Sequence, residues 1–194
     1  EFFSMAPDER LELLKLVLEY FPGLVLFQVG SGPLPEALHL ARAGADLGAD
    51  GLLCLPPSYY ADAPTEGIVK YLKAVADATD VPFVLYNFPR HTGNALTPEI
   101  LAQVPHFGMK DSSGDQSLIP CTPRYFLGHD AHILQARRAG AAGFVSATAN
   151  AAPELFVALE RAEGEEADRL QARVRELHGF LRSPQVPSLK HLLS

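Results

Sequence analysis

Residues 81–115 read VPFVLYNFPRHTGNALTPEILAQVPHFGMKDSSGD, and this stretch decides the fold. It contains two short apolar runs, at 81–86 and 106–110, and each run ends in a polar side chain followed by turn-forming residues. Between the two runs we expect a helix, because Thr97 is a favourable N-cap and Pro98 suits the first helical position. A strand, a helix and a second strand make a parallel crossover unit.

Tyr86 and Lys110 are the last residues of the two apolar runs. Both strands of a crossover unit point the same way, so the two side chains should emerge together at the carboxyl ends of neighbouring strands, where parallel α/β folds place their chemistry. A lysine in this position is either a salt-bridged structural residue or a reactive amine, and burial favours the free amine that attacks a carbonyl. The phenol of Tyr86 could pass protons while a carbinolamine forms and collapses.

The same alternation of strands and helices extends along most of the chain. We expect strands at residues 23–29, 51–55, 81–86, 106–110, 124–127 and 143–146. We expect helices at residues 7–20, 34–47, 66–78, 98–104, 131–138 and 154–162. This order predicts an α/β protein with a parallel sheet and right-handed crossovers, either an open doubly wound sheet or a closed barrel.

The composition excludes some classes of partner. The chain has 194 residues and a formal net charge of −7, which would repel the phosphates of a nucleic acid. No apolar run approaches the ~20 residues that a membrane-spanning helix needs, so we expect no membrane partner. Cys54 and Cys121 lack any CxxC spacing, which favours a reduced, cytoplasmic protein over a disulfide-linked secreted one.

Three motifs of the central stretch resemble the pyruvate-dependent class I aldolases of the dihydrodipicolinate synthase and N-acetylneuraminate lyase family. They are Tyr86-Asn87-Phe88-Pro89, Thr92-Gly93 and Gly108-Met109-Lys110-Asp111-Ser112-Ser113-Gly114-Asp115. The resemblance extends over residues 2–153 and implies a (β/α)8 TIM barrel. It also implies that Lys110 forms an imine with the carbonyl of a 2-oxo acid and that Tyr86 relays protons.

Metal and cofactor sites have no support in the sequence. The seven histidines are scattered, and neither HxH nor HExxH occurs. A Schiff-base lysine takes the electron-sink role that a divalent ion would otherwise have. We therefore expect neither a metal nor another cofactor, and a small-molecule 2-oxo acid as the substrate.

The length conflicts with a complete barrel of this kind, which needs ~250 residues. Residues 1–10 resemble the family immediately after its second strand, so the first two strands and a threonine-rich loop that helps to bind the pyruvoyl carboxylate are expected to be missing. Either they are omitted from this sequence, the alternative we favour, or the protein is a degraded relative. The connection from Lys110 to Gly128 is also short for a full helix.

We expect a partial barrel domain at residues 1–162 and a C-terminal helical extension at residues 163–194. Residues 163–182 alternate in charge and predict a helix that either packs on the barrel, as we favour, or binds a partner as a coiled coil. Pro184 and Pro187 are expected to interrupt the chain before a last helical segment.

Two adjacent tyrosines follow the strand at residues 51–55. In the family a tyrosine near this position reaches across a dimer contact and extends the proton relay of the neighbouring subunit. The resemblance favours Tyr59 over Tyr60 for that role, and packing of two aromatic rings at a surface is the alternative for each. It also implies a homodimer or homotetramer.

The residues after Tyr86 bear on the substrate. Dihydrodipicolinate synthases have an arginine directly before the Thr-Gly pair, where it grips the carboxylate of the aldehyde substrate; here that residue is His91, with Arg90 one place earlier. Phe88 after Asn87 is more similar to the sugar-acid aldolases of the family. Both features favour a 2-keto-3-deoxy sugar acid.

The ends of the last two strands complete the expected pocket. By resemblance, the backbone of Gly128 and Val145 closes the pocket around the pyruvate methyl group, with Ser146 and Thr148 nearby. His129 is either a polar sugar contact or a neighbour of a helix cap.

The sequence thus predicts a Schiff-base-forming carbon-carbon lyase with Lys110, Tyr86 and Tyr59 as catalytic residues and Gly128, Val145, His91 and Ser146 as substrate-binding residues. Two alternatives stay open. One is 4-hydroxy-tetrahydrodipicolinate synthase, which joins pyruvate to aspartate semialdehyde, and the other is a catalytically silent member of the family.

Overall fold

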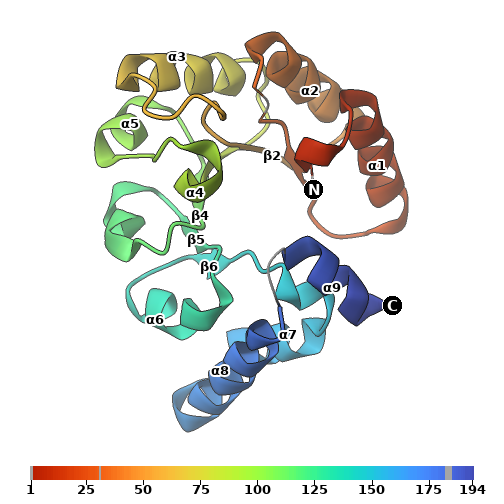
Figure 1. The fold of residues 1–194 in the computed structure, drawn as a ribbon, viewed down its shortest axis with the longest axis vertical. Helices are drawn as coiled ribbons and strands as arrows, with labels where there is room; N and C mark the ends of the chain where they lie inside the picture. Colours follow the sequence, from red (N-terminus) through yellow and green to blue (C-terminus); the bar gives the residue numbers. More distant parts are fainter. Residues whose placement is uncertain (1, 31, 182–184) are drawn as a thin grey trace.

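The computed structural model describes residues 2–30, 32–181 and 185–194, and its centre is a parallel sheet of six strands (Figure 1). The strands are β1 (Leu26–Gln28), β2 (Gly51–Cys54), β3 (Phe83–Asn87), β4 (Gly108–Asp111), β5 (Tyr125–Leu127) and β6 (Gly143–Phe144). Their order in the sheet is their order in the chain, and every neighbouring pair is parallel. The predicted α/β class with a parallel sheet is confirmed.

Helices follow the strands in alternation. They are α1 (Pro7–Tyr20), α2 (Leu34–Leu47), α3 (Thr65–Ala76), α4 (Pro89–Thr92), α5 (Pro98–Gln103), α6 (Ile133–Arg138), α7 (Pro153–Arg161), α8 (Gly164–Gly179) and α9 (Gln185–Leu193). Short 3-10 helices are η1 (Phe2–Ser4), η2 (Gln116–Cys121), η3 (Asp130–His132) and η4 (Thr148–Asn150). The curved row of strands has the helices α1, α2, α3, α5 and α6 along its outer side (Figure 1).

The side chains of each strand alternate between two surroundings, as the pleat requires. On the helix-facing side they enter the main core, as Leu52, Leu85 and Met109 do. On the opposite side a second, smaller cluster joins Leu53, Leu55, Val84 and Tyr86, with partly buried Phe2 and Phe88 packed against it. The second cluster borders the face on which Tyr86 and Lys110 lie.

The helix of the central crossover unit begins as the sequence predicts. The Thr97 side chain accepts a hydrogen bond from Ile100 N at 3.4 Å, and Pro98 is the first helical residue. The bounds of α1 and α2 match the expected residues 7–20 and 34–47, and the left-handed Gly48 (φ 98°) ends α2. Capping residues and apolar periodicity are local signals, which is why these elements were predictable.

Other expectations were wrong in detail. The run 89–92 after Tyr86 is not a simple turn but the short helix α4, which Pro89 begins and the left-handed Gly93 ends. Strand β6 stops at Phe144, so Val145 and Ser146 lie in the loop beyond it. Pro187 does not interrupt the chain, because it lies in the first turn of α9, where a helix needs no N–H donor. Pro184 lies outside the described residues.

Helices α7 and α8 lie beside the β6 edge of the sheet (Figure 1). Helix α8 contacts α7, η3 and α6, and its buried Gln171 donates to Asp130 O at 2.9 Å and accepts from Leu134 N at 2.9 Å. The link between β4 and β5 contains only η2 and no full α-helix, in agreement with its short length. Strands β1 and β6 are the two edges of the sheet.

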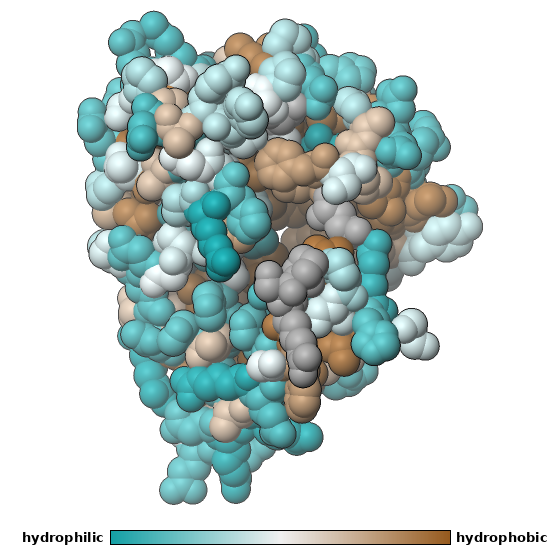
Figure 2. Space-filling view, in the orientation of Figure 1, coloured by the Kyte–Doolittle hydropathy of each residue, from teal (hydrophilic) through white to brown (hydrophobic). Residues whose placement is uncertain are grey.

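The surface seen in the orientation of Figure 1 is mostly hydrophilic. Figure 2 shows hydrophobic side chains gathered around a hollow near the middle of this view. Within the described ranges, no helix combines the length and the apolar character needed to cross a membrane.

Candidate active site

Strands β3 and β4 bring Tyr86 and Lys110 together. The two residues are partners in the parallel register, and Lys110 Nζ lies 4.2 Å from the centroid of the Tyr86 ring. Tyr86 is buried and Lys110 is half-buried. An ammonium or amine therefore lies over the face of an aromatic ring at the carboxyl end of the sheet.

The salt-bridged alternative for Lys110 has no support in the described part of the chain. The salt bridges found there join other cations to other carboxylates, and Lys110 is in none of them. A lysine held against an aromatic ring and without a carboxylate partner is better placed to act as an amine nucleophile than one held in an ion pair.

A hydroxyl group lies beside the Tyr86 phenol. Ser112 Oγ donates a long hydrogen bond of 3.5 Å to Tyr86 Oη, and Ser112 N donates to Asn87 O at 2.9 Å. A Cβ atom on Gly128 would overlap with Ser112 Oγ and crowd the backbone oxygen of Asp111, so a larger residue after β5 would force the Ser112 side chain to move. Gly128 therefore has a steric reason to be glycine, next to the Lys110 strand.

Aromatic rings extend from Tyr86 along the loop that follows β3. The Phe88 ring is stacked on Tyr86 at a centroid distance of 5.7 Å, and the His91 ring lies 4.2 Å from Phe88. His91 and Arg90 are exposed. Helix α4 thus places His91 at the outer end of a row of rings whose inner end is Tyr86.

Tyr59 has an unusual backbone conformation for a residue other than glycine. Its φ is 81°, its side chain is 89% exposed, and its ring meets Tyr60 edge-on at a centroid distance of 5.1 Å. The loop is fixed by buried Asn94, whose side-chain amide donates to Pro57 O at 2.8 Å and to Tyr60 O at 2.9 Å. With such exposure, Tyr59 is not part of the buried site formed within one chain.

Val145 and Ser146, two of the predicted substrate-binding residues, follow β6 and have different surroundings. Val145 N donates to Leu127 O at 2.8 Å, and its side chain is 38% exposed. Ser146 Oγ accepts a hydrogen bond from Ala149 N at 3.0 Å, so its hydroxyl is bound to the backbone of the short helix η4. Thr148 is fully buried, and its hydroxyl has no hydrogen-bond partner among the described residues.

A group of histidines lies at the carboxyl end of β5. The His129 ring is 5.1 Å from His132 and 5.4 Å from His178, and His178 Nδ1 lies 3.5 Å from the Asp130 carboxylate. Burial lowers the pKa of His129, and the neighbouring His132 and His178 lower it further. No group of three His, Cys, Asp or Glu side chains within residues 2–30, 32–181 and 185–194 has the arrangement of a metal site.

One buried cluster beside Lys110 was not predicted. Asp111, Asn87 and Tyr125 are joined by side-chain hydrogen bonds on the helix-facing side of the sheet. Burial raises the pKa of the Tyr125 phenol, as does its hydrogen bond to Asp111. The only sequence signal is that Asp111 follows Lys110 and must face the opposite side of the strand.

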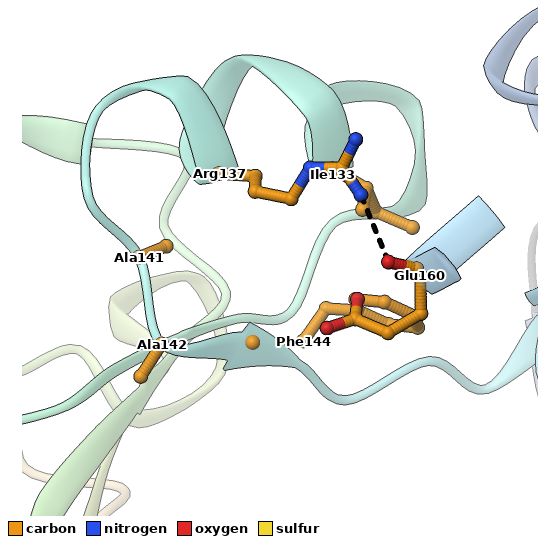
Figure 3. A pocket seen from close by; sticks show the side chains of 7 residues that line it. Ile133, Arg137, Ala141, Ala142, Phe144 and Glu160 are labelled. Atoms are coloured by element: carbon orange, nitrogen blue, oxygen red, sulfur yellow. Dashed lines mark hydrogen bonds between the residues drawn. The ribbon is translucent and has the colours of Figure 1, made fainter. Parts of the chain in front are cut away.

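A pocket at the amino end of the sheet surrounds an arginine that binds the end of a helix. It is lined by Arg137, Glu160 and the residues that lead into β6, and Figure 3 shows the Arg137 side chain reaching toward the end of α7. Arg137 donates to Leu159 O and Glu160 O at 3.1 Å each and to Ala162 O at 2.7 Å. The guanidinium thus satisfies the free carbonyls at the C-terminus of α7.

The family follows from comparison with known proteins. The model of the dihydrodipicolinate synthetase family matches residues 1–193. The chain belongs to this family. A 4-hydroxy-tetrahydrodipicolinate synthase from Methanopyrus kandleri is 35% identical over 192 residues, which cover 92% of this chain and 63% of that protein.

Solved structures similar at above 25% identity include a synthase and an aldolase. A dihydrodipicolinate synthase from Acinetobacter baumannii, in complex with pyruvate, matches with a TM-score of 0.86 and 28% identity over 96% of this chain and 70% of that one. A catalytic lysine mutant of the Ruminococcus gnavus sialic acid aldolase matches with a TM-score of 0.85 and 26% identity over 92% and 64%. The chain spans 60–70% of the length of three curated relatives that it matches.

Proposed function

We propose that this protein is a Schiff-base-forming carbon-carbon lyase in which Lys110 forms the imine. The observation that carries the proposal is the register pair Tyr86 and Lys110, with the amine 4.2 Å from the ring centroid and in no salt bridge of the described residues. The pyruvate bound in the Acinetobacter baumannii structure supports a 2-oxo acid as the substrate.

In this mechanism the Lys110 amine attacks the carbonyl carbon of the 2-oxo acid, and loss of water from the carbinolamine gives a protonated imine. The imine accepts the electron pair of the breaking carbon-carbon bond, which releases an aldehyde and leaves an enamine. The Tyr86 phenol, beside the Ser112 hydroxyl, donates and accepts the protons of these steps. Protonation of the enamine and hydrolysis of the imine return pyruvate and the free amine.

We favour a 2-keto-3-deoxy sugar acid as the larger substrate. The exposed His91 occupies the position before Thr92-Gly93, and a histidine cannot grip a carboxylate with the two-pronged geometry of arginine. The similarity to a sialic acid aldolase supports this choice. The second candidate is 4-hydroxy-tetrahydrodipicolinate synthase, which the name of the Methanopyrus kandleri relative favours.

The proposal includes a closed (β/α)8 barrel and a homodimer or homotetramer. Two further strands between β6 and β1 would close the sheet, and the 60–70% span of the curated relatives supports this completion. The exposed Tyr59 would reach the site of a neighbouring subunit, and its exposure supports an intersubunit contact. Residues 163–194 would form the extension that packs beside the barrel.

The test is the intact mass of the full-length protein before and after incubation with pyruvate and borohydride. We expect a stable adduct that Lys110→Ala abolishes and that Lys73→Ala, an exposed lysine of α3, leaves unchanged. A full-length protein without an adduct would overturn the lyase proposal and favour the silent family member. Turnover of 2-keto-3-deoxy sugar acids against condensation with aspartate semialdehyde then separates the two substrate candidates.

A further inference from the structure

The carboxylate of Asp111 is a buried group that the mechanism above leaves unused. Asp111 is fully buried directly after Lys110. It accepts four hydrogen bonds: Oδ1 from Asn87 Nδ2 at 2.8 Å and Ser113 N at 3.0 Å, and Oδ2 from Tyr125 Oη at 2.6 Å and Ser113 Oγ at 2.9 Å. Four donors fill the acceptor positions of an ionised carboxylate, which has no proton of its own to give.

The negative charge of Asp111 has no cation beside it in the described part of the chain. None of the salt bridges there includes it, so neutral donors alone hold the charge. Placing an ion in the interior without a counter-ion is costly, and a well-packed apolar residue would serve stability better. A purpose beyond packing is therefore expected.

The partners of Asp111 come from the strands on either side. Asn87 is the last residue of β3 and the register partner of Asp111, while Tyr125 is the first residue of β5. Asn87 Oδ1 also accepts a hydrogen bond from Leu96 N at 2.9 Å. This bond joins the connection between β3 and β4 to the same cluster. The cluster therefore joins three neighbouring strands and the connection between two of them.

Tyr86 and Lys110, the proposed reactive pair, lie beside this cluster on the opposite face of the sheet. Tyr86 precedes Asn87 and Lys110 precedes Asp111, and successive side chains of a strand point to opposite faces. A shift of β3 against β4 would move the phenol relative to the amine by the same amount. The Asn87–Asp111 hydrogen bond opposes this shift from the side that the substrate does not reach.

We propose that Asp111 is a positioning residue whose carboxylate, bound by Asn87, Tyr125 and Ser113, holds the ends of β3 and β4 so that the Tyr86 phenol and the Lys110 amine stay aligned. This inference rests on the proposed function. It assigns Asp111 no contact with the substrate, and its effect is on the rates of imine formation and turnover rather than on substrate affinity.

The main variant is Asp111→Asn, which keeps the shape of the side chain. It replaces one acceptor oxygen with an NH2 group, so that a donor faces the donors that bound the carboxylate. Misalignment of about 1 Å costs up to about 10²-fold in rate, and we expect a fall of this order in kcat and in the rate of borohydride trapping, with KM little changed. The control Asp50→Asn makes the same chemical change at the amino end of β2, where Asp50 accepts from Val25 N at 2.8 Å. It should leave kcat and trapping unchanged.

Two further variants keep the test decisive. Tyr125→Phe removes one donor and keeps the carboxylate, so it should fold and slow trapping by a smaller factor than Asp111→Asn. The double variant Asn87→Asp with Asp111→Asn exchanges the donor and the acceptor of their hydrogen bond, and it should recover part of the lost kcat. If the residue were merely structural, the reversal would restore the melting temperature and leave the kcat of the folded protein unchanged.

Each outcome decides the inference. If Asp111→Asn lowers the melting temperature while the folded protein traps pyruvate at the wild-type rate, the positioning role is wrong. If Asp111→Asn does not fold, unchanged trapping by Tyr125→Phe overturns the inference instead. A wild-type protein that forms no adduct overturns the proposed function together with this inference, and that result is recognised before any Asp111 variant is made.

Discussion

The two ends of the parallel sheet differ in how their polar groups are satisfied. At the amino end, Arg137 donates to three carbonyls, and His106 places one ring nitrogen 2.7 Å from Val104 O and the other 3.1 Å from Thr122 Oγ1. At the carboxyl end lie the buried side-chain atoms that lack a hydrogen-bond partner within the described ranges. They are Arg10 Nε, Gln28 Nε2, His129 Nδ1, Thr148 Oγ1 and His178 Nδ1.

The backbone shows the same difference. Among the described residues other than glycine, only Tyr59 and Asp62 have a positive φ, and both lie in the loop after β2 at the carboxyl end. Unsatisfied polar atoms and unfavourable backbone angles cost stability, and proteins concentrate them at functional sites. The amino end is therefore organised for stability, and the carboxyl end carries costs that a function must justify.

The largest expected effect is at the carboxyl end, from Tyr86→Phe. Loss of a positioned acid-base group lowers rates by about 10²- to 10⁴-fold, and we expect this range for kcat on the 2-keto-3-deoxy acid. The unfolding free energy should change little, because the ring stays in its cluster. Tyr20→Phe on the exposed face of α1 is the control, and unchanged turnover in Tyr86→Phe would contradict the role of the phenol.

The reverse pattern is expected at the amino end. Arg137→Met removes charged hydrogen bonds to two carbonyls of α7 and to that of Ala162 just after it, and should lower the unfolding free energy by about 2–3 kcal/mol, measured by chemical denaturation. The rate of pyruvate trapping by the folded protein should not change. Arg138→Met is the control, since its exposed salt bridge with Asp168 contributes at most about 1 kcal/mol. A loss of trapping in Arg137→Met would break the contrast between the two ends.

A smaller effect should separate the two exposed tyrosines. If Tyr59 serves a neighbouring subunit, Tyr59→Phe lowers kcat by roughly tenfold, toward the low end of the range for proton transfer, while Tyr60→Phe changes it little. Neither variant should alter stability by much, because both side chains are exposed. Steady-state kinetics of the two variants side by side would show the difference, and equal rates would remove Tyr59 from the relay.

The smallest effect concerns pH and the histidine group at the carboxyl end. The pKa of His129 lies below its ordinary value of 6.5, so the unfolded chain binds the proton more readily than the folded one. Stability should therefore be full above pH 6.5 and fall as the pH drops through the lowered pKa. The side chains of His132, His178 and Asp130 face His129 and belong to the same group.

The matching measurement is chemical denaturation between pH 5 and pH 7.5 for the wild type and for His129→Gln. The slope of stability against pH below 6.5 should be shallower in the variant. An identical slope in both proteins would show that the loss of stability comes from other groups.

The sequence predicts that Tyr86 and Lys110 lie side by side because the information is local. Tyr86 and Lys110 each end an apolar run, and one crossover unit makes their strands neighbours. The cluster around Asp111 could not be predicted in the same way. Tyr125 becomes its partner only through the lateral register of β4 and β5, which no spacing in the sequence reveals.

Other misses have similar causes. The sequence predicts a turn where the short helix α4 lies because four residues carry no periodicity, although Pro89 and Gly93 are a helix start and a helix end. The conformation of Tyr59 depends on the Asn94 hydrogen bonds to its loop, which come from a segment more than thirty residues away. Tertiary contacts of this kind determine the conformation of loops, whereas capping residues and apolar periodicity determine where helices and strands begin and end.

The placement of Tyr86 and Lys110 in one crossover unit also bears on how the protein assembles. Contacts between segments close in sequence form early in folding, because little loop entropy is lost in making them. The contact between Tyr86 and Lys110 needs only β3, β4 and their connection, whereas the edges β1 and β6 are joined only through the whole row of strands between them. The alignment of phenol and amine should therefore be inherited from an early folding unit, and later steps add the remaining strands and helices around a pair that already exists.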